Sequence, residues 1–174
     1  MRAILLTGPP GIGKTTVIRG LAERLKGYRL GGFYTAELRE SGERRGFRLV
    51  GFGGEEAVIA HVERPGSPRV GKYGVNVAAL ERAATLLAPD ADVELVLLDE
   101  IGKMECLAPG LVAAIERLLD SGRPLVATVA AKGPGLIASV KARPGVELLR
   151  VTRENRDALP EALYRRLQAE LGHP

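Results

Sequence analysis

Cysteine, histidine and long apolar stretches are scarce in this 174-residue chain. The single cysteine, Cys106, cannot form an internal disulfide, and with only two histidines beside it there is no cluster at metal-ligand spacing, which excludes a structural zinc site. No apolar run approaches the roughly 18 residues that a membrane span requires, and no signal-peptide hydrophobic region follows Met1. We therefore expect a cytoplasmic protein without membrane association.

The sequence also lacks the bias of disordered or nucleic-acid-binding chains. Hydrophobic residues make up 45% and charged residues 26% of it, which is typical of an ordinary globular protein. The net charge of +4 is spread along the chain without a lysine tract or alternating basic and aromatic residues, which favours a mixed surface that binds a small anion over binding to nucleic acid. At this length a single domain spanning 1–174 is expected, with a monomer as the default.

Short apolar runs and helical patterns alternate along most of the chain. This alternation is typical of a largely parallel sheet that is covered by helices and joined by right-handed crossovers, so an α/β fold is expected. Asn76 can cap the second helix, and Gly122 fits the end of the third. The apolar runs lie at 3–7, 95–98, 125–129 and 146–151, and the helical patterns at 17–25, 76–87, 111–119, 136–140 and 159–167.

The stretch from 32 to 50 interrupts this rhythm. Two strand-like runs flank the turn-forming residues E-S-G-E at 40–43, a pattern that predicts a β-hairpin. A loop rich in glycine and proline is expected at 64–74. We interpret the hairpin as an insertion into the α/β fold.

The strongest chemical signal is a glycine-rich motif between the first strand and the first helix. In such a loop, backbone N–H groups converge on phosphate oxygens, and the following helix directs the positive end of its dipole at the same anion. Lys14 is expected to reach the β- and γ-phosphates, and Thr15 to supply a hydroxyl to Mg²⁺. The predicted phosphate-binding residues are Gly8, Pro9, Pro10, Gly11, Ile12, Gly13, Lys14, Thr15 and the adjacent Thr16.

An acidic pair follows the apolar run at 95–98. Asp99 completes a Walker B pattern and is expected to hold Mg²⁺ through water, so Thr15 and Asp99 are the predicted metal-binding residues. Glu100 is suited to orient and deprotonate an attacking water, which makes Lys14, Asp99 and Glu100 the predicted catalytic residues. The predicted nucleotide contacts around this pair extend to Leu98, Ile101, Gly102 and Lys103.

Four segments, in this order and spacing, span almost the whole chain: the glycine-rich motif at 8–16, G-F-Y-T-A-E at 32–37 with R-R-G-F at 44–47, D-E-I-G-K-M-E at 99–105, and V-T-R-E-N-R at 151–156. Together they resemble the thermophile-associated P-loop nucleoside-triphosphatase family, which includes a vertebrate cancer-related member. The resemblance implies a three-layer P-loop fold with a mostly parallel, RecA-like sheet. It also implies slow, Mg²⁺-dependent hydrolysis of ATP, GTP and other nucleoside triphosphates (NTPs) to the diphosphate and phosphate, with little base discrimination.

Several other polar residues have two interpretations each. An arginine of the hairpin could act as a finger on the γ-phosphate, although a solvated hairpin is favoured; the candidates are Arg39, Arg44, Arg45 and Arg48. Lys103 could neutralise charge in the transition state or pair with Glu105. Thr128 could sense the γ-phosphate or be an ordinary strand residue.

The last candidates concern the base. Asn155 and Arg156 could flank it or form the start of the final helix. The aromatic residues Phe33, Phe47 and Tyr73 could stack on a base, but a place in the core is favoured for them. For Cys106, a role as a small buried filler is favoured over a role as a nucleophile.

Three function classes fit these motifs. The leading one is an NTP hydrolase; the others are a small-molecule phosphotransferase and a nucleotide-dependent switch that acts on RNA. Glu100 beside Asp99 weighs against the phosphotransferase, and the absence of an N-K-x-D string weighs against a GTPase switch. The expected partner is therefore a small-molecule nucleoside triphosphate with Mg²⁺.

Overall fold

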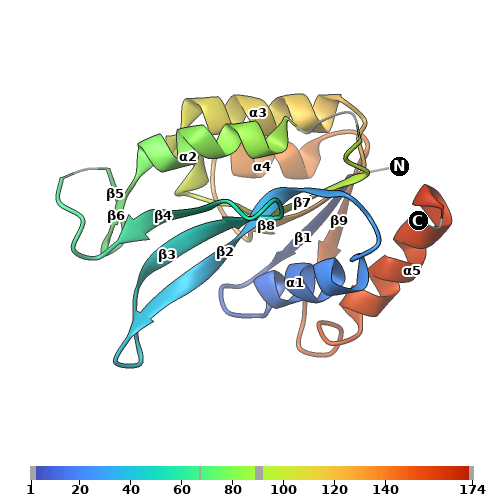
Figure 1. Ribbon diagram of the computed structural model, residues 1–174, viewed down its shortest axis with the longest axis horizontal. Coiled ribbons are helices and arrows are strands. Elements are labelled where there is room, and N and C mark those ends of the chain that lie inside the picture. The colour runs from blue at the N-terminus through green and yellow to red at the C-terminus, as the bar shows by residue number, and fades with distance from the viewer. Residues whose placement is uncertain (1–2, 67, 89–91, 173–174) are drawn as a thin grey trace.

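A mixed β-sheet is the middle layer of the computed structural model, which describes residues 3–66, 68–88 and 92–172 (Figure 1). Within these residues nine strands form one sheet in the order β5-β6-β4-β3-β2-β7-β8-β1-β9. The strands are β1 (Ala3–Gly8), β2 (Leu30–Glu40), β3 (Glu43–Gly51), β4 (Glu56–His61), β5 (Arg69–Val70), β6 (Tyr73–Val75), β7 (Leu95–Ile101), β8 (Leu125–Ala130) and β9 (Val146–Arg150).

Helices cover both faces of this sheet (Figure 1). One face carries α1 (Lys14–Arg24) and α5 (Leu159–Leu171). The other carries α2 (Val77–Ala83), the 3₁₀ turn η1 (Ala84–Leu87), α3 (Pro109–Asp120) and α4 (Leu136–Ala142), and a second 3₁₀ turn, η2 (Glu105–Leu107), precedes α3. The predicted α/β fold with a helix-flanked, largely parallel central sheet is confirmed.

The central strands bury apolar side chains on both faces. In β1, Ile4 and Leu6 pack in the core with α1 and α5, whereas Leu5 packs in the core with α3 and α4. Successive side chains of a strand point to opposite faces, so a strand between two helical layers needs a continuous apolar run. This explains why the runs at 3–7 and 95–98 are readable in the sequence.

The parallel half of the sheet positions the functional motifs. The pairings β2–β7, β7–β8, β8–β1 and β1–β9 are parallel. Strand β8 lies between β1, which ends in the glycine-rich loop, and β7, which carries Asp99 and Glu100. Because these strands are parallel, this order brings the carboxyl ends of β1, β7 and β8 to one edge.

The inserted hairpin is larger than the sequence indicates. Strands β2 and β3 pair antiparallel and turn at Ser41 and Gly42, as expected, but β4, β6 and β5 continue the antiparallel pairing outward. We call β3, β4, β5 and β6 the antiparallel wing. Part of the predicted loop at 64–74 belongs to it, because β5 and β6 are only two and three residues long and form through pairing with each other and with β4.

Local signals at helix ends hold in the structure. The Oδ1 atom of Asn76 accepts a hydrogen bond from the backbone N–H of Ala79 at 3.2 Å, so Asn76 caps α2 as expected. Gly122 follows α3 with a φ of +69°. In the described part of the chain, no helix combines the length and apolarity needed to cross a membrane.

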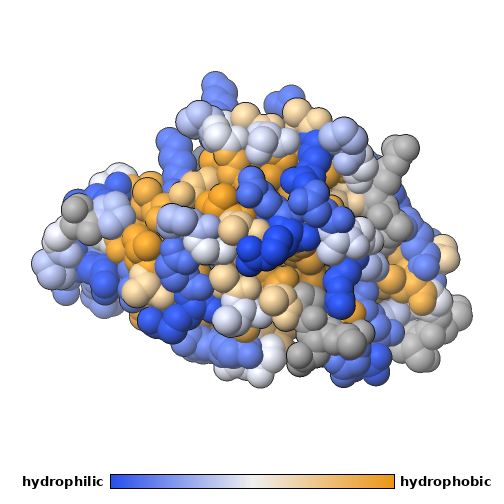
Figure 2. All heavy atoms as spheres, turned by 90° about the horizontal axis from the view of Figure 1, so that it is seen from above, coloured by the Kyte–Doolittle hydropathy of each residue, from blue (hydrophilic) through white to orange (hydrophobic). Residues whose placement is uncertain are grey.

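Charged and apolar residues are interspersed on the face that α2 and α3 form (Figure 2). The large apolar side chains with high exposure are Val58 in the antiparallel wing and Leu148 on β9. Neither lies on the strands that meet at the site edge, β1, β7 and β8.

Gly32 allows β2 to approach β7 closely. It pairs with Leu97 in register and has a φ of +89°. A Cβ atom at this position would lie 2.0 Å from the carbonyl oxygen of Leu97, which is backbone and cannot swing aside. The close approach brings the next residues of β2 alongside the end of β7.

We expect Gly32→Ala to lower the free energy of unfolding by about 1–3 kcal/mol more than Gly42→Ala. Gly42 also has a positive φ, +82°, but a Cβ there meets nothing within 4 Å, so its replacement should cost only about 1–2 kcal/mol of backbone strain. Urea unfolding followed by circular dichroism measures both. Equal losses would show that β2 and β7 move apart without cost.

Candidate active site

The glycine-rich loop connects β1 to α1 at the carboxyl edge of the sheet. Gly11 and Gly13 adopt positive φ angles of +76° and +110°, which residues other than glycine rarely adopt. Gly13 precedes α1 without providing a side-chain cap, and the first turn of α1 contains no acidic residue. The backbone N–H groups at the start of α1 are therefore available to an anion.

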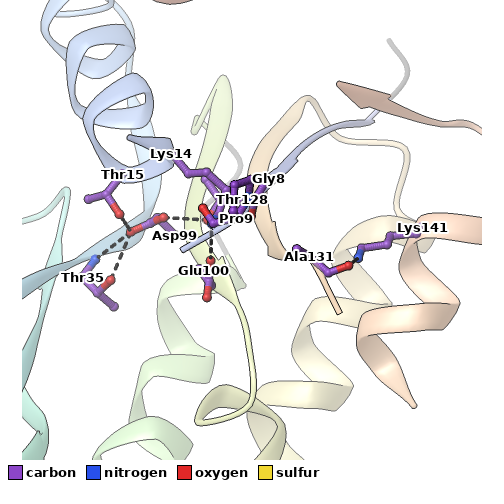
Figure 3. A network of polar contacts seen from close by, with 10 residues as sticks. All are labelled: Gly8, Pro9, Lys14, Thr15, Thr35, Asp99, Glu100, Thr128, Ala131 and Lys141. Carbon is purple, nitrogen blue, oxygen red and sulfur yellow. Dashed lines mark hydrogen bonds and ion pairs between the residues drawn. The ribbon is translucent and has the colours of Figure 1, made fainter. Parts of the chain in front are cut away.

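Lys14 lies folded over this loop. Its side chain is 9% exposed, and its Nζ donates to the carbonyl oxygens of Gly8 at 3.1 Å and Pro9 at 3.5 Å. The same Nζ lies 3.6 Å from Oε2 of Glu100 (Figure 3). The structure therefore brings together two of the three predicted catalytic residues.

Asp99 is a buried carboxylate surrounded by hydroxyl groups (Figure 3). It is 1% exposed and accepts hydrogen bonds from Thr15 Oγ1 at 2.8 Å, Thr128 Oγ1 at 2.6 Å and Thr35 Oγ1 at 3.1 Å. A buried charge is tolerated only when it is well hydrogen-bonded, and these donors supply the compensation. The donors come from α1, β8 and β2.

The sequence did not identify Thr35 as a site residue, although it lies in the G-F-Y-T-A-E string at 32–37. Its proximity to Asp99 follows from the pairing of Phe33 with Leu98, which a single strand does not reveal. Thr128, which we considered as a sensor of the γ-phosphate, bonds to Asp99, so it orients this carboxylate in the structure.

The oxygens of Thr15 and Asp99 suit Mg²⁺. This hard cation prefers oxygen ligands and usually takes only one or two from the protein, with phosphate oxygens and water as the others. Thr15 Oγ1 and Asp99 Oδ2 are adjacent, 2.8 Å apart, and lie beside the start of α1. The donor set therefore fits the predicted metal.

Glu100 has the environment of a general base. Burial raises the pKa of its carboxyl; the ammonium of Lys14 lowers it, and Asp99 raises it further. A carboxylate whose pKa is shifted towards neutrality accepts a proton more readily than an exposed one. Its side chain is 33% exposed, so water has access to it.

A second buried glutamate, Glu105, lies beside Glu100. A Cβ atom placed on Gly102 would lie 2.9 Å from Glu100 Oε1 and 3.0 Å from Glu105 Oε2, so both carboxyl groups border this glycine. Glu105 is 5% exposed, and burial raises its pKa to about 8. It is therefore protonated at neutral pH and poorly suited to act as a base.

The other residues predicted around the acidic pair are divided between core and surface. The side chains of Leu98 and Ile101 are fully buried in the core, so they hold β7 in place and do not reach the surface. Lys103 and Thr16 are exposed. Lys103 forms no ion pair with Glu105, both being described residues, because Glu105 points into the interior.

Lys141 of α4 is a basic residue near the site that the sequence analysis missed. Its Nζ donates to the carbonyl oxygen of Ala131 at 2.8 Å (Figure 3), and burial lowers its pKa. No local motif marks it, because only the folded structure brings this lysine near Glu100 and Lys14.

The hairpin arginines form ion pairs with nearby glutamates. Arg39 and Arg44 pair with Glu37 on β2, and the other two pair with glutamates of the hairpin, β4 or the following turn. The interpretation as a solvated hairpin, favoured from the sequence, agrees with these contacts.

The aromatic residues lie in the core or pack against it, which agrees with the favoured interpretation. Phe33 is fully buried, and the rings of Phe47 and Tyr73 pack edge to face at 5.1 Å. Cys106 is partly buried against the core, and burial raises the pKa of its thiol, which fits a filler role.

Asn155 and Arg156 form different contacts in the segment that follows β9. Asn155 accepts from the backbone N–H of Thr152 and donates to the carbonyl of Arg150, each at 2.8 Å, so it closes the turn after β9. Arg156 reaches the glycine-rich loop, where its Nη1 donates to the carbonyl oxygen of Ile12 at 3.2 Å.

Comparison with known proteins agrees with this geometry. The model of a family described as NTPase matches residues 3–164. The nucleoside-triphosphatase THEP1 of Thermotoga petrophila is 41% identical over 164 residues, covering 92% of this chain and 90% of that protein. The nucleoside-triphosphatase THEP1 of Methanosarcina acetivorans is 39% identical over 177 residues, covering 99% of this chain and all of that protein.

Two solved structures share the fold. The crystal structure of THEP1 from the hyperthermophile Aquifex aeolicus matches with a TM-score of 0.80 and 32% identity, over 97% of this chain and 99% of that one. The solution structure of a human cancer-related nucleoside triphosphatase matches with a TM-score of 0.82 and 33% identity, over 97% and 98%.

The buried Glu105 predicts a pH dependence of stability. Its pKa is about 8 in the folded protein against an ordinary value of 4.5, so between these values the folded state binds the proton that the unfolded state has released. Stability should therefore fall as pH rises from about 5 to 8, by up to about 5 kcal/mol from this group. Glu105→Gln should remove this part of the decline in urea unfolding, whereas Glu43→Gln, on the exposed hairpin, should track the parent. Parallel curves for parent and Glu105→Gln would contradict the prediction.

Proposed function

This chain belongs to the NTPase family and is a nucleoside triphosphatase, and from this premise we propose that Lys14, Thr15, Asp99 and Glu100 carry out the hydrolysis. The observation that supports this assignment is their convergence at the start of α1. The ammonium of Lys14 lies 3.6 Å from Glu100, and the hydroxyl of Thr15 lies 2.8 Å from Asp99. Charge, metal-binding oxygens and a base thus meet where the helix dipole favours phosphate.

Lys14 and the loop would bind the phosphates. Backbone N–H groups around Gly13 would donate to phosphate oxygens, and Lys14 would exchange the carbonyls of Gly8 and Pro9 for the β- and γ-phosphates. Its positive charge would stabilise the negative charge that develops on the phosphate oxygens during transfer. Ion pairing with Glu100 keeps the ammonium at this position.

Thr15 and Asp99 would hold Mg²⁺, with Asp99 acting through water as the Walker B pattern predicts. Bound Mg²⁺ supplies charge neutralisation for the phosphate oxygens. Thr35 and Thr128 would act on Asp99 alone, since their hydroxyl groups hold its two oxygens in a fixed orientation. These hydrogen bonds would hold the Asp99 carboxylate in one rotamer, and a metal site requires ligands with such a fixed orientation.

Glu100 would act as the general base. Water attacks the γ-phosphorus while the bond from this phosphorus to the bridging oxygen breaks, which releases the diphosphate. The water proton passes to the carboxylate of Glu100 and then to solvent. The raised pKa of Glu100 favours this transfer.

Ion pairs formed by surface arginines weigh against the two alternative functions, phosphotransfer and an RNA-dependent switch. A phosphotransferase would use the arginine-bearing hairpin as its lid, but these arginines pair with neighbouring glutamates. An RNA-dependent switch would require a free basic surface, whereas arginines elsewhere also pair with acids, as Arg166 does with Glu147. We retain as predictions a cytoplasmic location, a monomeric state and broad specificity for the base.

Lys14→Ala should weaken the binding of Mg²⁺-nucleotide by about 10- to 100-fold, because a charge-assisted contact contributes about 1.5–3 kcal/mol. Phosphate release should be lost while circular dichroism shows an intact fold. Lys26→Ala, which removes an exposed lysine just beyond α1, should behave as the parent. Undiminished nucleotide binding by folded Lys14→Ala would overturn the assignment of the loop.

Glu100→Gln and Asp99→Asn should fail in different ways. Glu100→Gln keeps size and polarity but removes the base, so phosphate release should fall by roughly 10²- to 10⁴-fold while binding survives. Asp99→Asn disturbs the metal site, so its defect should include a changed Mg²⁺ dependence. Calorimetry and phosphate-release assays on the same preparations measure both effects.

A parental rate in Glu100→Gln would remove the main argument for hydrolysis over phosphotransfer. An identical Mg²⁺ dependence in Asp99→Asn and the parent would remove Asp99 from the metal site.

A further inference from the structure

The functional groups lie on one side of the glycine-rich loop. Asp99, Glu100 and Thr128 come from β7 and β8, which lie next to β1 in the sheet, and Thr35 comes from β2 beyond them. On the opposite side β1 pairs with β9. A nucleotide whose γ-phosphate lies beside Glu100 would therefore run along the loop towards the segment that follows β9, with its base at that end.

Arg156, in that segment, lies against the loop. Its Nη1 donates to the carbonyl oxygen of Ile12 at 3.2 Å, and its Cδ lies 3.5 Å from the point that a Cβ on Gly13 would occupy. The arginine stem therefore packs along the loop backbone at the residue immediately before α1. This contact places the guanidinium next to the phosphate-binding groups.

The segment presents Arg156 in a defined conformation. Asn155 bridges Thr152 and the carbonyl of Arg150, and the backbone N–H of Arg156 donates to the carbonyl oxygen of Thr152 at 3.1 Å. The N–H of Leu159 at the start of α5 donates to the carbonyl of Asn155. A side chain on such a closed turn binds a ligand at a lower entropic cost than one on an open loop.

The guanidinium is accessible and weakly paired. The Arg156 side chain is 41% exposed, and its acidic neighbour Asp157, at 3.7 Å from Nε, is 92% exposed. An ion pair of this kind contributes little. One edge of the guanidinium is held by Ile12, which leaves its planar face for a ligand.

We propose that the face of Arg156 is the platform on which the base of the nucleotide stacks, an inference that rests on the proposed binding of the triphosphate at Lys14. A guanidinium plane stacks on any base, because every base has a π-face, and it reads no base edge. The aromatic alternatives are engaged elsewhere, because Phe33 is fully buried and the rings of Phe47 and Tyr73 pack against each other. Arg156 therefore selects for nucleosides as a class and accepts purines and pyrimidines alike.

The test compares nucleotides with a ligand that has phosphates but no base. Calorimetry with Mg²⁺ would measure the dissociation constants of non-hydrolysable ATP, GTP and CTP analogues and of inorganic tripolyphosphate. In Arg156→Ala the three nucleotide constants should rise together, by about 5- to 150-fold, as expected for the loss of one stacking contact. The constant for tripolyphosphate should stay within about twofold of the parent.

Two further variants separate stacking from charge. Arg156→Lys keeps a cation and a donor but lacks the planar face, so it should lose nucleotide affinity nearly as Arg156→Ala does. Arg165→Ala removes an exposed arginine of α5 that pairs with Glu161, and it should bind every ligand as the parent does.

Each contrary result has a definite meaning. Equal losses for tripolyphosphate and nucleotides would show that Arg156 acts on the phosphates or on the loop, and recovery in Arg156→Lys would show that charge suffices; both overturn the proposal. A loss for one base alone, or no loss, overturns it too. Retention of tripolyphosphate binding by Lys14→Ala would instead contradict the proposed function.

Discussion

The hydrogen bonds that the buried carboxylate of Asp99 accepts are the interaction on which the site depends. A charge at 1% exposure is stable only while its oxygens are satisfied, and here three hydroxyls supply the donors. Because Thr15, Thr35 and Thr128 come from α1, β2 and β8, the same carboxylate ties α1 and the two neighbouring strands to β7. The requirement to satisfy one buried charge thus fixes the relative positions of the elements that carry out the chemistry.

The two acidic residues near Asp99, Glu100 and Glu105, are stabilised in different ways. Lys14 lies within ion-pair distance of Glu100, while burial raises the pKa of Glu105 to about 8 so that this group is neutral. Carboxyl groups so close together are unfavourable for stability, because the charge of Asp99 raises the pKa of Glu100, and both raise the pKa of Glu105. Such a cluster is typical of a functional site, where stability is given up for a carboxylate with a raised pKa.

The sheet divides into a part that holds the site and a part that supports it. The parallel strands deliver Asp99, Glu100 and the glycine-rich loop to one edge. In the antiparallel wing Phe47 packs against Tyr73, and the arginines of β3 pair with glutamates of β2, of β4 and of the turn after β4. Strand β2 lies between the two parts, and its Thr35 reaches Asp99. Gly32 makes this possible, since a side chain there would separate β2 from β7.

The sequence alone determined the features that depend on neighbouring residues: the loop at 8–16, the acidic pair at 99–100, the hairpin turn and the cap at Asn76. These follow from local backbone conformation and hydrophobic periodicity. The tertiary structure alone decided the features that depend on which strands pair: the hydroxyls of Thr35 and Thr128 on Asp99, the position of Lys141, the burial that keeps Glu105 protonated, and the contact of Arg156 with the loop. The short strands β5 and β6 belong to this second group, because pairing with other strands, rather than a pattern of their own, forms them.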